Sequence, residues 1–354
     1  MKELGVGILG AGGIAALSHL PEIAAVDGLR VVNMAGRKEK RLKLLQERFN
    51  VPRYCTDWEA LLADPEVDAV VIALPHPLHA EAALKAFAAG KHVLMTKPLC
   101  ATIDEANQLV EACEAHPELC VFIRPDFGSV DYAIRDQIAT GKIGKVSGGH
   151  ARYSHGGPEV YYAGVADFFG EKVDKDNLWF FNEGEASVGA LFDMGVYCVS
   201  KITGIMGRAK RVMAHLSTID KPTKLDDTAT LMIEFESGAL GTAETSWCDP
   251  ARTGFMHIHG NKGKLWSPGS SGNTLELFEP SSFTDENAQQ LTTPINLGPG
   301  ENQHAEWLRC IRDGIQPQLS NIWFSRHVTE ILLAAQESHA NGCWVDIHSN
   351  PEPQ

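Results

Sequence analysis

The feature that most constrains the fold is a glycine-rich turn near the start of the chain. An apolar run from Leu4 to Leu9 has the pattern of a buried strand, and Gly10–Ala15 lead from it into a helical run. This is the G-x-G-x-x-G/A arrangement of dinucleotide-binding folds, in the strand-to-helix context that it requires. Gly10 permits the tight turn, Gly12 lets the backbone approach a pyrophosphate, and the helix N-terminus faces the phosphates. Against the alternative of a purely structural turn, we predict that a dinucleotide is bound by Gly10, Gly12, Gly13 and Ile14.

The residues after a second strand, 29–34, indicate which dinucleotide binds. Folds that select NAD commonly end this strand with an Asp or Glu that binds the ribose 2′-hydroxyl. Here Gly36 stands in place of an acid, and Arg41 lies one helical turn beyond Arg37 and Lys38. Arg37 and Lys38 can bind a 2′-phosphate through charge-assisted hydrogen bonds. We expect NADP(H) to be preferred and NAD(H) to be the second choice; the alternative is an ordinary basic start to the following helix.

A short apolar strand, Val93–Met95, leads to Lys97 and Pro98. In open α/β sheets ligands bind at the carboxyl edge of the strands, and a following proline biases Lys97 away from helical dihedrals. An ammonium group held there can polarise a substrate oxygen and lie near the cofactor. The alternative is a solvated lysine that closes a strand.

The loop after the strand 68–73 is a further candidate for cofactor contact. Leu74 and Pro75 begin a stiff loop, and His79 lies in the first turn of the helix 78–88. Because loops after strands line the cofactor groove, we expect Leu74, Pro75 and His79 to touch the nicotinamide half. For His79 the equal alternative is a polar residue at a helix start.

Strands and helices alternate throughout the first 123 residues. Two capping boxes, Thr56-x-x-Glu59 and Thr102-x-x-Glu105, predict the starts of helices, and a strand is expected at 119–123. Alternation of this kind predicts a doubly wound parallel sheet, a Rossmann domain. A length of 354 residues with 44% apolar residues favours two domains.

The second half has a different pattern. After a helix at about 126–140, short strand-like stretches separated by turn glycines predict an open, mainly antiparallel sheet, with helices near 303–313 and 322–340. We therefore divide the chain into a dinucleotide-binding domain, 1–123, and an α/β domain for substrate binding and oligomerisation, 124–354. The overall class is α/β followed by α+β. A connection at 154–187 is rich in Gly, Asp and aromatic residues, and a loop of this length is usually functional.

Asp193 and Tyr197 are the candidates for chemistry in this second half. In a helix they lie one turn apart on one face, so a carboxylate and a phenol point to the same place. The alternative is a packed tyrosine and a solvated acid. The weaker substrate-site candidates are Arg124, His155, Tyr161 and Trp179.

Composition excludes several classes of partner. A formal net charge of -14 argues against nucleic acid and anionic membranes, and no apolar run approaches the length of a membrane span. The eight cysteines show no metal-ligand spacing, so we expect no metal site and reduced thiols. With no signal-peptide pattern at the start, the expected location is the cytoplasm.

These motifs together resemble the glucose-fructose oxidoreductase, inositol dehydrogenase and rhizopine-catabolism (Gfo/Idh/MocA) family, over essentially the whole chain. The segments that carry the resemblance are Gly10–Ala15, Leu74–His79, Ala89–Pro98 and Asp193–Tyr197. The resemblance implies that Lys97 serves the reaction, as the lysine of the family's Glu-Lys-Pro motif does. It also places Asp193 and Tyr197 on the family's Asp-x-Gly-x-His motif, whose Asp and His attend the substrate.

Two departures from the family pattern bear on the chemistry. Thr96 replaces the usual glutamate before the lysine, and Tyr197 replaces the histidine, as in the branch that resembles glucose-fructose oxidoreductase and the dihydrodiol dehydrogenases. That branch uses NADP(H), which fits the absent acid at Gly36. Because a phenol is a poor base at neutral pH, Tyr197 needs a nearby cation, for which Lys97 is the candidate.

The resemblance predicts an oxidoreductase that moves a hydride between a nicotinamide and a carbinol or carbonyl carbon of a sugar or polyol. Tyr197 is expected to exchange the proton, Lys97 to stabilise the oxygen, and Asp193 to hold a substrate hydroxyl. The alternatives are a dinucleotide-dependent sensor without net catalysis and a glycosidase that uses its nicotinamide transiently. A homodimer or homotetramer is also expected, formed through the outer face of the sheet.

Overall fold

The computed structural model describes residues 3–125, 127–173, 178–186, 188–269, 274–298 and 300–352. The chain forms two compact units. Unit 1 consists of Met1–Asp126, Glu159–Leu178 and Asn302–Thr329, and unit 2 of Phe127–Pro158, Trp179–Glu301 and Glu330–Gln354. The predicted boundary after residue 123 lies near the end of the first segment. Two later segments also belong to unit 1, which the division into 1–123 and 124–354 did not include.

Unit 1 is built on a parallel sheet, with the strand order β3-β2-β1-β4-β5-β6 among the described residues. Its strands are β1 (Leu4–Leu9), β2 (Leu29–Ala35), β3 (Arg53–Cys55), β4 (Ala69–Ile72), β5 (His92–Met95) and β6 (Val121–Ile123). The order reverses between β1 and β4, where doubly wound sheets bind their ligands. The predicted Rossmann sheet is therefore confirmed.

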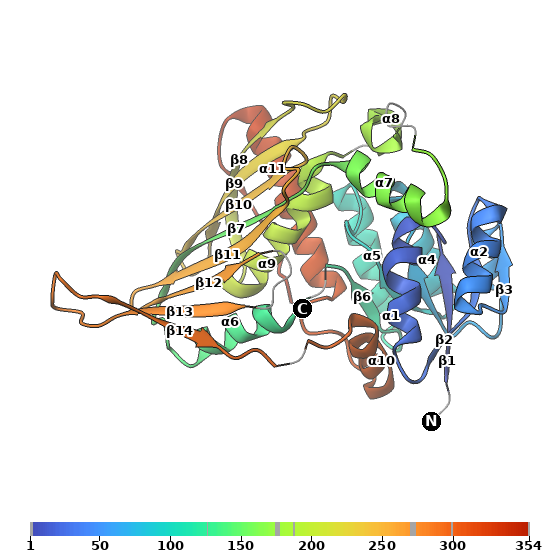
Figure 1. Cartoon of the computed structure of the whole chain (residues 1–354), viewed down its shortest axis with the longest axis horizontal. Helices are drawn as coiled ribbons and strands as arrows, with labels where there is room; N and C mark the ends of the chain where they lie inside the picture. Colours follow the sequence, from blue (N-terminus) through green and yellow to red (C-terminus); the bar gives the residue numbers. More distant parts are fainter. Residues whose placement is uncertain are drawn as a thin grey trace. The chain divides into compact units, whose positions relative to one another are not determined.

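Helices cover both faces of this sheet (Figure 1). On one face, α3 (Trp58–Leu62), α4 (His79–Ala88) and α5 (Ile103–Ala115) share a buried core with alternate strand residues such as Ile72 and Met95. On the other, the π-helical turn η1 (Ala15–His19), α1 (Leu20–Ala24), α2 (Glu39–Phe49), α7 (Pro158–Phe169) and α10 (Gln303–Asp313) pack over residues such as Ile8 and Leu94. Burial on both sides explains why these strands are almost wholly apolar.

Two helix starts in unit 1 can be compared with their predictions. Thr102 caps α5 with Glu105 in a complete capping box, as expected. For α3 the cap is Asp57, whose side chain accepts from the Glu59 backbone N–H, and the predicted box with Thr56 is wrong. An aspartate one position later caps equally well, so the helix begins there.

Unit 2 is built on a larger sheet, with the order β14-β13-β12-β11-β7-β10-β9-β8-β15 in the part of the chain that the structure describes. Its strands are β7 (Val146–Ser154), β8 (Ala209–Ser217), β9 (Thr228–Phe235), β10 (Leu240–Ser246), β11 (Thr253–Gly260), β12 (Lys264–Pro268), β13 (Leu275–Pro280), β14 (Gln290–Ile295) and β15 (Val345–Asp346). Strands β7 and β10 pair in parallel and the other pairs are antiparallel. The mainly antiparallel sheet is confirmed.

One face of this sheet is covered by helices. Helix α9 (Val196–Met206) packs against β7 and β10, and α6 (Ser129–Ala139) packs against α9. Strand β9 shows the alternation clearly, because Leu231 and Ile233 are buried while Met232 is 46% exposed. One face of β9 is therefore covered, and its other face is open in the single chain. Helix α11 (Ile322–Asn341) completes the C-terminal part.

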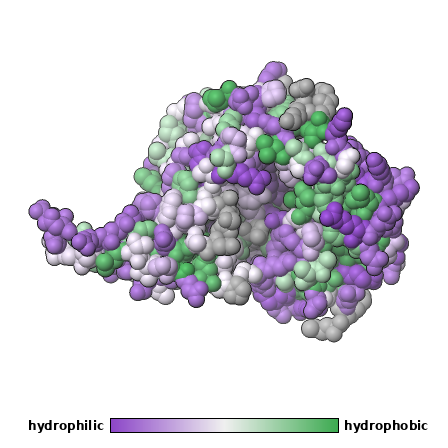
Figure 2. Space-filling model, viewed as in Figure 1, coloured by the Kyte–Doolittle hydropathy of each residue, from purple (hydrophilic) through white to green (hydrophobic). Residues whose placement is uncertain are grey.

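The connection at 154–187 is largely helical where it is described, although it was expected to be a loop. It contains α7, the 3-10 turn η3 (Trp179–Phe181) and the short α8 (Glu183–Ala186). Residues 174–177 and 187 of this connection, and the expected helix start at 126, lie outside the described residues. Strands β3, β12, β14 and β15 were not predicted. The hairpin that joins β13 to β14 presents a hydrophilic surface (Figure 2).

Candidate functional site

The glycine-rich loop of unit 1 has the backbone geometry that a dinucleotide needs. Gly10 has φ +95°, and a Cβ built on it would lie 2.6 Å from the Ala73 carbonyl oxygen. A Cβ on Gly12 would meet nothing nearer than the Gly10 oxygen at 4.0 Å, so the approach to its backbone is open. Ile14 is the N-cap of η1, so it lies at the amino end of this helical segment. These residues fit a bound pyrophosphate.

Gly13 lies against helix α7. A Cβ on Gly13 would lie 2.4 Å from Val165 and 2.8 Å from the Tyr161 hydroxyl, both in α7. This glycine therefore allows α7 to pack directly on the loop. Tyr161, a predicted substrate residue, stands beside the glycine-rich loop within unit 1, with its ring edge against Tyr162.

The basic residues after β2 are divided between two environments. Arg37 is exposed and makes no ion pair with the described residues. Lys38 and Arg41 both bind the Glu171 carboxylate: Lys38 Nζ lies 3.3 Å from Oε2, and Arg41 Nε lies 2.8 Å from Oε1. A Cβ on Gly36 would meet Leu42 at 3.2 Å and Ala11 beyond it, so this position lies against the glycine-rich loop.

The loops after β4 and β5 are tied together by His79. Its Nδ1 lies 2.7 Å from the Pro98 carbonyl oxygen and its Nε2 lies 3.0 Å from that of Leu74. The ring is buried, and burial lowers the pKa of His79 to about 4. At pH 7 the neutral imidazole has one N–H, so it donates to one of these two carbonyl oxygens. Thr96 is also buried and donates its hydroxyl to the Ile72 carbonyl. This network fixes the direction in which the chain leaves the sheet at Lys97.

Four predicted residues of unit 1 follow the aligned carboxyl ends of successive strands. The register pairs Leu9 with Ile72, Ile72 with Met95, and Met95 with Ile123. The residues that follow these strand ends at one edge are Gly10, Leu74, Lys97 and Arg124. Lys97 and Arg124 are both half-buried. Arg124 Nη1 lies 3.4 Å from the Ser18 hydroxyl of η1, so its guanidinium is held within unit 1.

In unit 2, Asp193 and Tyr197 lie on consecutive helical segments. Asp193 belongs to the π-helical turn η4 (Leu191–Gly195), and Tyr197 is the second residue of α9. The start of η4 is fixed by Asp226, whose side chain accepts from the Leu191 N–H at 2.6 Å and whose carbonyl accepts from Ala190. Burial raises the pKa of Asp226 to about 6, and the neighbouring Asp227 and Asp193 add to this.

Asp193 is held by two groups from distant parts of the sequence. The buried Trp247 indole donates from Nε1 to Asp193 Oδ2 at 2.9 Å. His155 Nε2 lies 3.8 Å from the same oxygen. Because His155 Nδ1 accepts from the Gly157 N–H at 2.7 Å, the neutral ring carries its proton on Nε2, toward Asp193. Asp193 is thus a positioned carboxylate, not a freely solvated acid.

Several aromatic rings of unit 2 pack against one another near Trp247 and Tyr197. Tyr197 stacks on Tyr153 of β7, with ring centroids 5.9 Å apart and planes 16° apart. Trp179 packs against Phe180 at 4.2 Å, and Phe180 meets the edge of Trp247 at 6.2 Å. Two of the predicted substrate residues, His155 and Trp179, are therefore brought toward Asp193 and Trp247 within unit 2.

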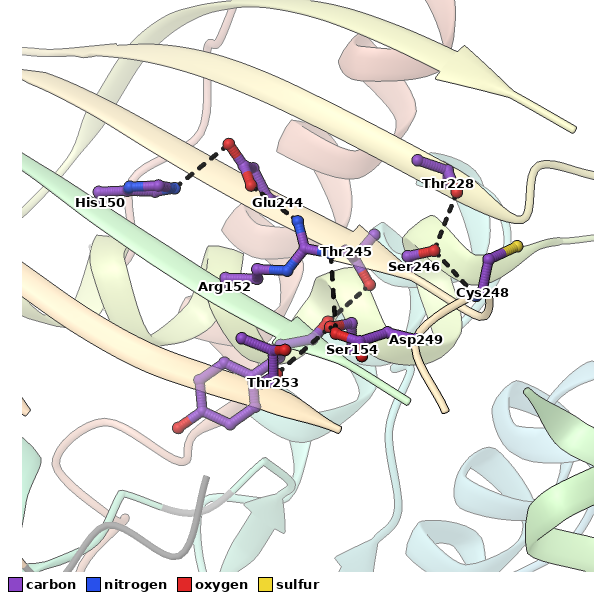
Figure 3. A network of polar contacts seen from close by, with 11 residues as sticks. His150, Arg152, Ser154, Thr228, Glu244, Thr245, Ser246, Cys248, Asp249 and Thr253 are labelled. Carbon is purple, nitrogen blue, oxygen red and sulfur yellow. Dashed lines mark hydrogen bonds and ion pairs between the residues drawn. The ribbon is translucent and has the colours of Figure 1, made fainter. Parts of the chain in front are cut away.

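A polar network fixes the strand ends that carry His155 and Trp247 (Figure 3). Arg152 of β7 binds Glu244 of β10 at 2.9 Å, and Ser154 donates to Asp249 at 2.6 Å. Ser154 and the paired Ser246 end the two parallel strands, so the next residues of both strands are placed side by side. The His155 N–H then donates to the Ser246 carbonyl at 3.0 Å.

Three residues around these groups were not predicted: Glu171, Trp247 and Tyr153. Trp247 directly follows β10, but nothing local links it to Asp193, which lies 54 residues earlier. Glu171 was not predicted because its segment was expected to be a loop.

Among the described residues no cluster of three or more His, Cys, Asp or Glu side chains could hold a metal ion. Nor does that part of the chain contain a helix long and apolar enough to span a bilayer.

A parallel sheet with a glycine-rich loop at its switch point, joined to a unit with a positioned carboxylate and phenol, defines the class of dinucleotide-dependent oxidoreductases. The comparisons with known proteins support this class. Residues 4–123 match the family described as "Oxidoreductase family, NAD-binding Rossmann fold" (GFO_IDH_MocA). Residues 132–266 match the GFO/IDH/MocA C-terminal domain. The chain belongs to the Gfo/Idh/MocA family, and it is an NAD(P)-binding oxidoreductase.

Several named proteins are similar over most of the chain. D-xylose 1-dehydrogenase (NADP(+)) 2 of Haloferax volcanii is 29% identical over 73% of this chain and 74% of its own length. Trans-1,2-dihydrobenzene-1,2-diol dehydrogenase of Xenopus laevis is 27% identical over 86% of each. The structure of a levoglucosan dehydrogenase in complex with NADH and levoglucosan has a TM-score of 0.80 at 22% identity, covering 98% of this chain and all 100% of the other. This last likeness establishes the fold.

Proposed function

We propose that this protein is a dehydrogenase or reductase that transfers a hydride between a nicotinamide and a carbinol or carbonyl carbon of a sugar, a sugar derivative or a polyol. The observation that carries the proposal is the Asp193 carboxylate, held by Trp247 at 2.9 Å and lying one helical turn from Tyr197. The names of the relatives, which include a xylose dehydrogenase and a dihydrodiol dehydrogenase, support a substrate with hydroxyl-bearing carbons.

The cofactor is held by the carboxyl edge of the unit 1 sheet. Gly10, Gly12 and Ile14 would take the pyrophosphate, and the loops that begin at Leu74 and Pro75 would lie along the nicotinamide half. When bound, the nicotinamide supplies or accepts the hydride. NADP(H) is the preferred form, because Gly36 leaves no carboxylate after β2 and Arg37 is exposed. One relative is named for NADP(+) and a structural neighbour contains NADH, which supports NAD(H) as the second cofactor.

Three side chains are assigned roles toward the substrate. Tyr197 exchanges the proton of the reacting hydroxyl, and Lys97 stabilises both the developing oxyanion and the phenolate form of Tyr197. Asp193 accepts from a second substrate hydroxyl, because its carboxylate is already oriented by Trp247. Trp179 offers a ring for the CH face of a sugar, and His155 is a further hydrogen-bonding group. Arg124 and Tyr161 are further substrate-site candidates.

An activity screen tests this proposal. A panel of aldoses, ketoses and polyols, with NADP and NAD and their reduced forms, is followed at the nicotinamide absorbance. We expect turnover with at least one polyhydroxylated substrate, with a higher kcat/KM for the NADP couple. Product analysis distinguishes net redox chemistry from glycoside cleavage with transient oxidation. A complete lack of turnover, with the cofactor still bound, would favour a dinucleotide sensor.

Location and assembly complete the proposal. We place the protein in the cytoplasm, where reducing conditions suit its eight free thiols.

We also propose a homodimer or homotetramer that pairs through the open face of the unit 2 sheet. That face carries packed rings such as His257 on Trp266, 5.2 Å apart, and exposed Met232. Light scattering at working concentration checks this, and a monomer would contradict it.

A further inference from the structure

The basic cluster formed by Lys38 and Arg41 at the start of α2 has an internal partner. Arg41 meets Glu171 with two guanidinium nitrogens, Nε to Oε1 at 2.8 Å and Nη2 to Oε2, and Lys38 Nζ lies 3.3 Å from Oε2. All three residues belong to unit 1. A planar fork of this kind binds a carboxylate or a phosphate in the same way. Of these two cations, Lys38 is expected to hold a 2′-phosphate together with Arg37, and Arg41 lies one helical turn beyond them.

Glu171 is placed here by the fold and not by a flexible chain. Helix α7 ends at Phe169, and Gly170 follows with φ +62°. The Glu171 N–H then donates to the Ala166 carbonyl at 2.8 Å, which is the bond of a Schellman-type helix end. Because α7 also packs on Gly13 through Val165, the backbone of Glu171 is fixed relative to the glycine-rich loop.

The side chains are ordered as well. The Arg41 guanidinium lies over the Phe169 ring, 4.4 Å from its centroid, so one face of the cation is already covered. The side chains of Arg41 and Glu171 are 17% and 22% exposed, which leaves this pair partly shielded from water. Hydrogen bonds from Arg41, more than those from Lys38, lower the pKa of Glu171 to about 2, so it is ionised at any working pH.

From this geometry we propose that Glu171 is an internal competitor for the 2′-phosphate of NADP(H). It occupies Lys38 and Arg41 and so determines how strongly the protein discriminates NADP(H) from NAD(H). The inference rests on the proposed preference for NADP(H), and it adds Arg41 to Lys38 as a cation that the 2′-phosphate would use. A 2′-phosphate must displace the carboxylate or share its two cations, whereas the 2′-hydroxyl of NAD(H) has no need of them. Glu171 therefore weakens the binding of NADP(H) but not that of NAD(H), and so narrows the difference in affinity between the two cofactors.

The test is a titration of NADPH and NADH, each alone, into the full-length wild type and the Glu171→Gln variant. Removal of the competing charge should tighten NADPH binding by about 3- to 10-fold, the range of a partly exposed ion pair, and leave NADH unchanged. The gain should shrink at high salt, because screening weakens the competition. Glu47→Gln is the matched control, since it removes one exposed carboxylate from α2.

Two further variants keep the proposal testable. If Glu171→Gln does not fold, Glu171→Asp takes its place. It retains the charge but shortens the side chain, so NADPH binding should tighten by a smaller factor. In an Arg41→Met background, Glu171→Gln should give little further gain, because the contested cation is absent.

The outcomes separate this inference from the proposed cofactor preference. If Arg41→Met and Arg37→Ala leave NADPH affinity unchanged, the cations are not the 2′-phosphate site and the cofactor assignment fails. If those variants weaken NADPH but Glu171→Gln does not tighten it, only the competitor role fails. Weaker NADPH binding in Glu171→Gln, or equal changes for both cofactors, would also overturn the competitor role.

Discussion

The two sheets place their functional side chains in different ways. In unit 1 the candidates Gly10, Lys97 and Arg124 each follow a strand, and the parallel register brings them to one edge. In unit 2 the Asp193 carboxylate lies close to Trp247 and His155, which follow the ends of β10 and β7. In a parallel sheet the topology places the functional residues, so each one can be predicted from the strand that precedes it. In the open sheet of unit 2 the functional residues are placed by contacts between segments that are distant in the sequence.

The largest effect is expected at the edge of the unit 1 sheet. Lys97→Met removes the positive charge that we propose stabilises the developing oxyanion. We expect kcat to fall by roughly 10²- to 10⁴-fold with cofactor affinity little changed. Steady-state kinetics and cofactor titration measure both quantities. Lys43→Met, at an exposed lysine paired with Glu39, is the control and should retain activity. A comparable loss of cofactor affinity would instead make Lys97 a binding residue.

The equivalent test in unit 2 is Trp247→Phe. The change keeps an aromatic ring in the core but removes the N–H that donates to Asp193 at 2.9 Å. Loss of a hydrogen bond to a charged group should lower kcat/KM by about 10-fold, since the carboxylate is less well oriented. Trp344→Phe, in the same unit, is the matched control. Unchanged kcat/KM in a folded Trp247→Phe protein would show that Asp193 does not need this donor.

A smaller and more selective effect is expected at Arg37. Arg37→Ala should weaken NADP(H) binding by about 3- to 10-fold and leave NAD(H) binding unchanged, because only the former loses a phosphate partner. Titration with both cofactors measures it. Arg30→Ala, at an exposed arginine at the other end of β2 that pairs with Glu3, serves as control. Equal weakening of both cofactors would remove the basis for the NADP(H) preference.

The smallest effect is a pH dependence in unit 2. Burial raises the pKa of Asp226 to about 6 in the folded chain, above its ordinary value, so the folded state binds this proton more tightly. The contribution of Asp226 therefore favours folding below the ordinary pKa and is lost as pH rises through about 6. Asp226→Asn should flatten the stability profile in that window, as measured by thermal unfolding. The control Asp220→Asn, at an exposed acid, should keep the wild-type slope.

Much of unit 1 could be predicted because each element carries a local signal. The strand β1, the glycine-rich loop and the Thr102 capping box were all correctly located from short patterns. Helix α7 was missed, since Gly164 interrupts a stretch of mixed aromatic and small residues that lacks a clear helical period. Strand β14 was missed for a related reason: most of its residues are exposed, so they show no apolar alternation.

The candidate site could be predicted only as far as local motifs extend. Asp193 and Tyr197 are on one helix turn, so their proximity follows from spacing alone. The Trp247 donor depends on how the end of β10 packs against η4, and the Glu171 partner of Arg41 is 130 residues away. Contacts of this kind are set by tertiary packing, for which one sequence carries no periodic signal.

The central claim is that Tyr197 carries the proton and that Lys97 acts on it. A double-mutant cycle with Tyr197→Phe and Lys97→Met tests this most directly, because phenylalanine keeps the ring on Tyr153 and removes only the hydroxyl. The account predicts that Tyr197→Phe alone loses roughly 10²- to 10⁴-fold in kcat, and that the double variant is scarcely worse than either single one. Near-normal turnover of Tyr197→Phe, or fully additive losses, would contradict it.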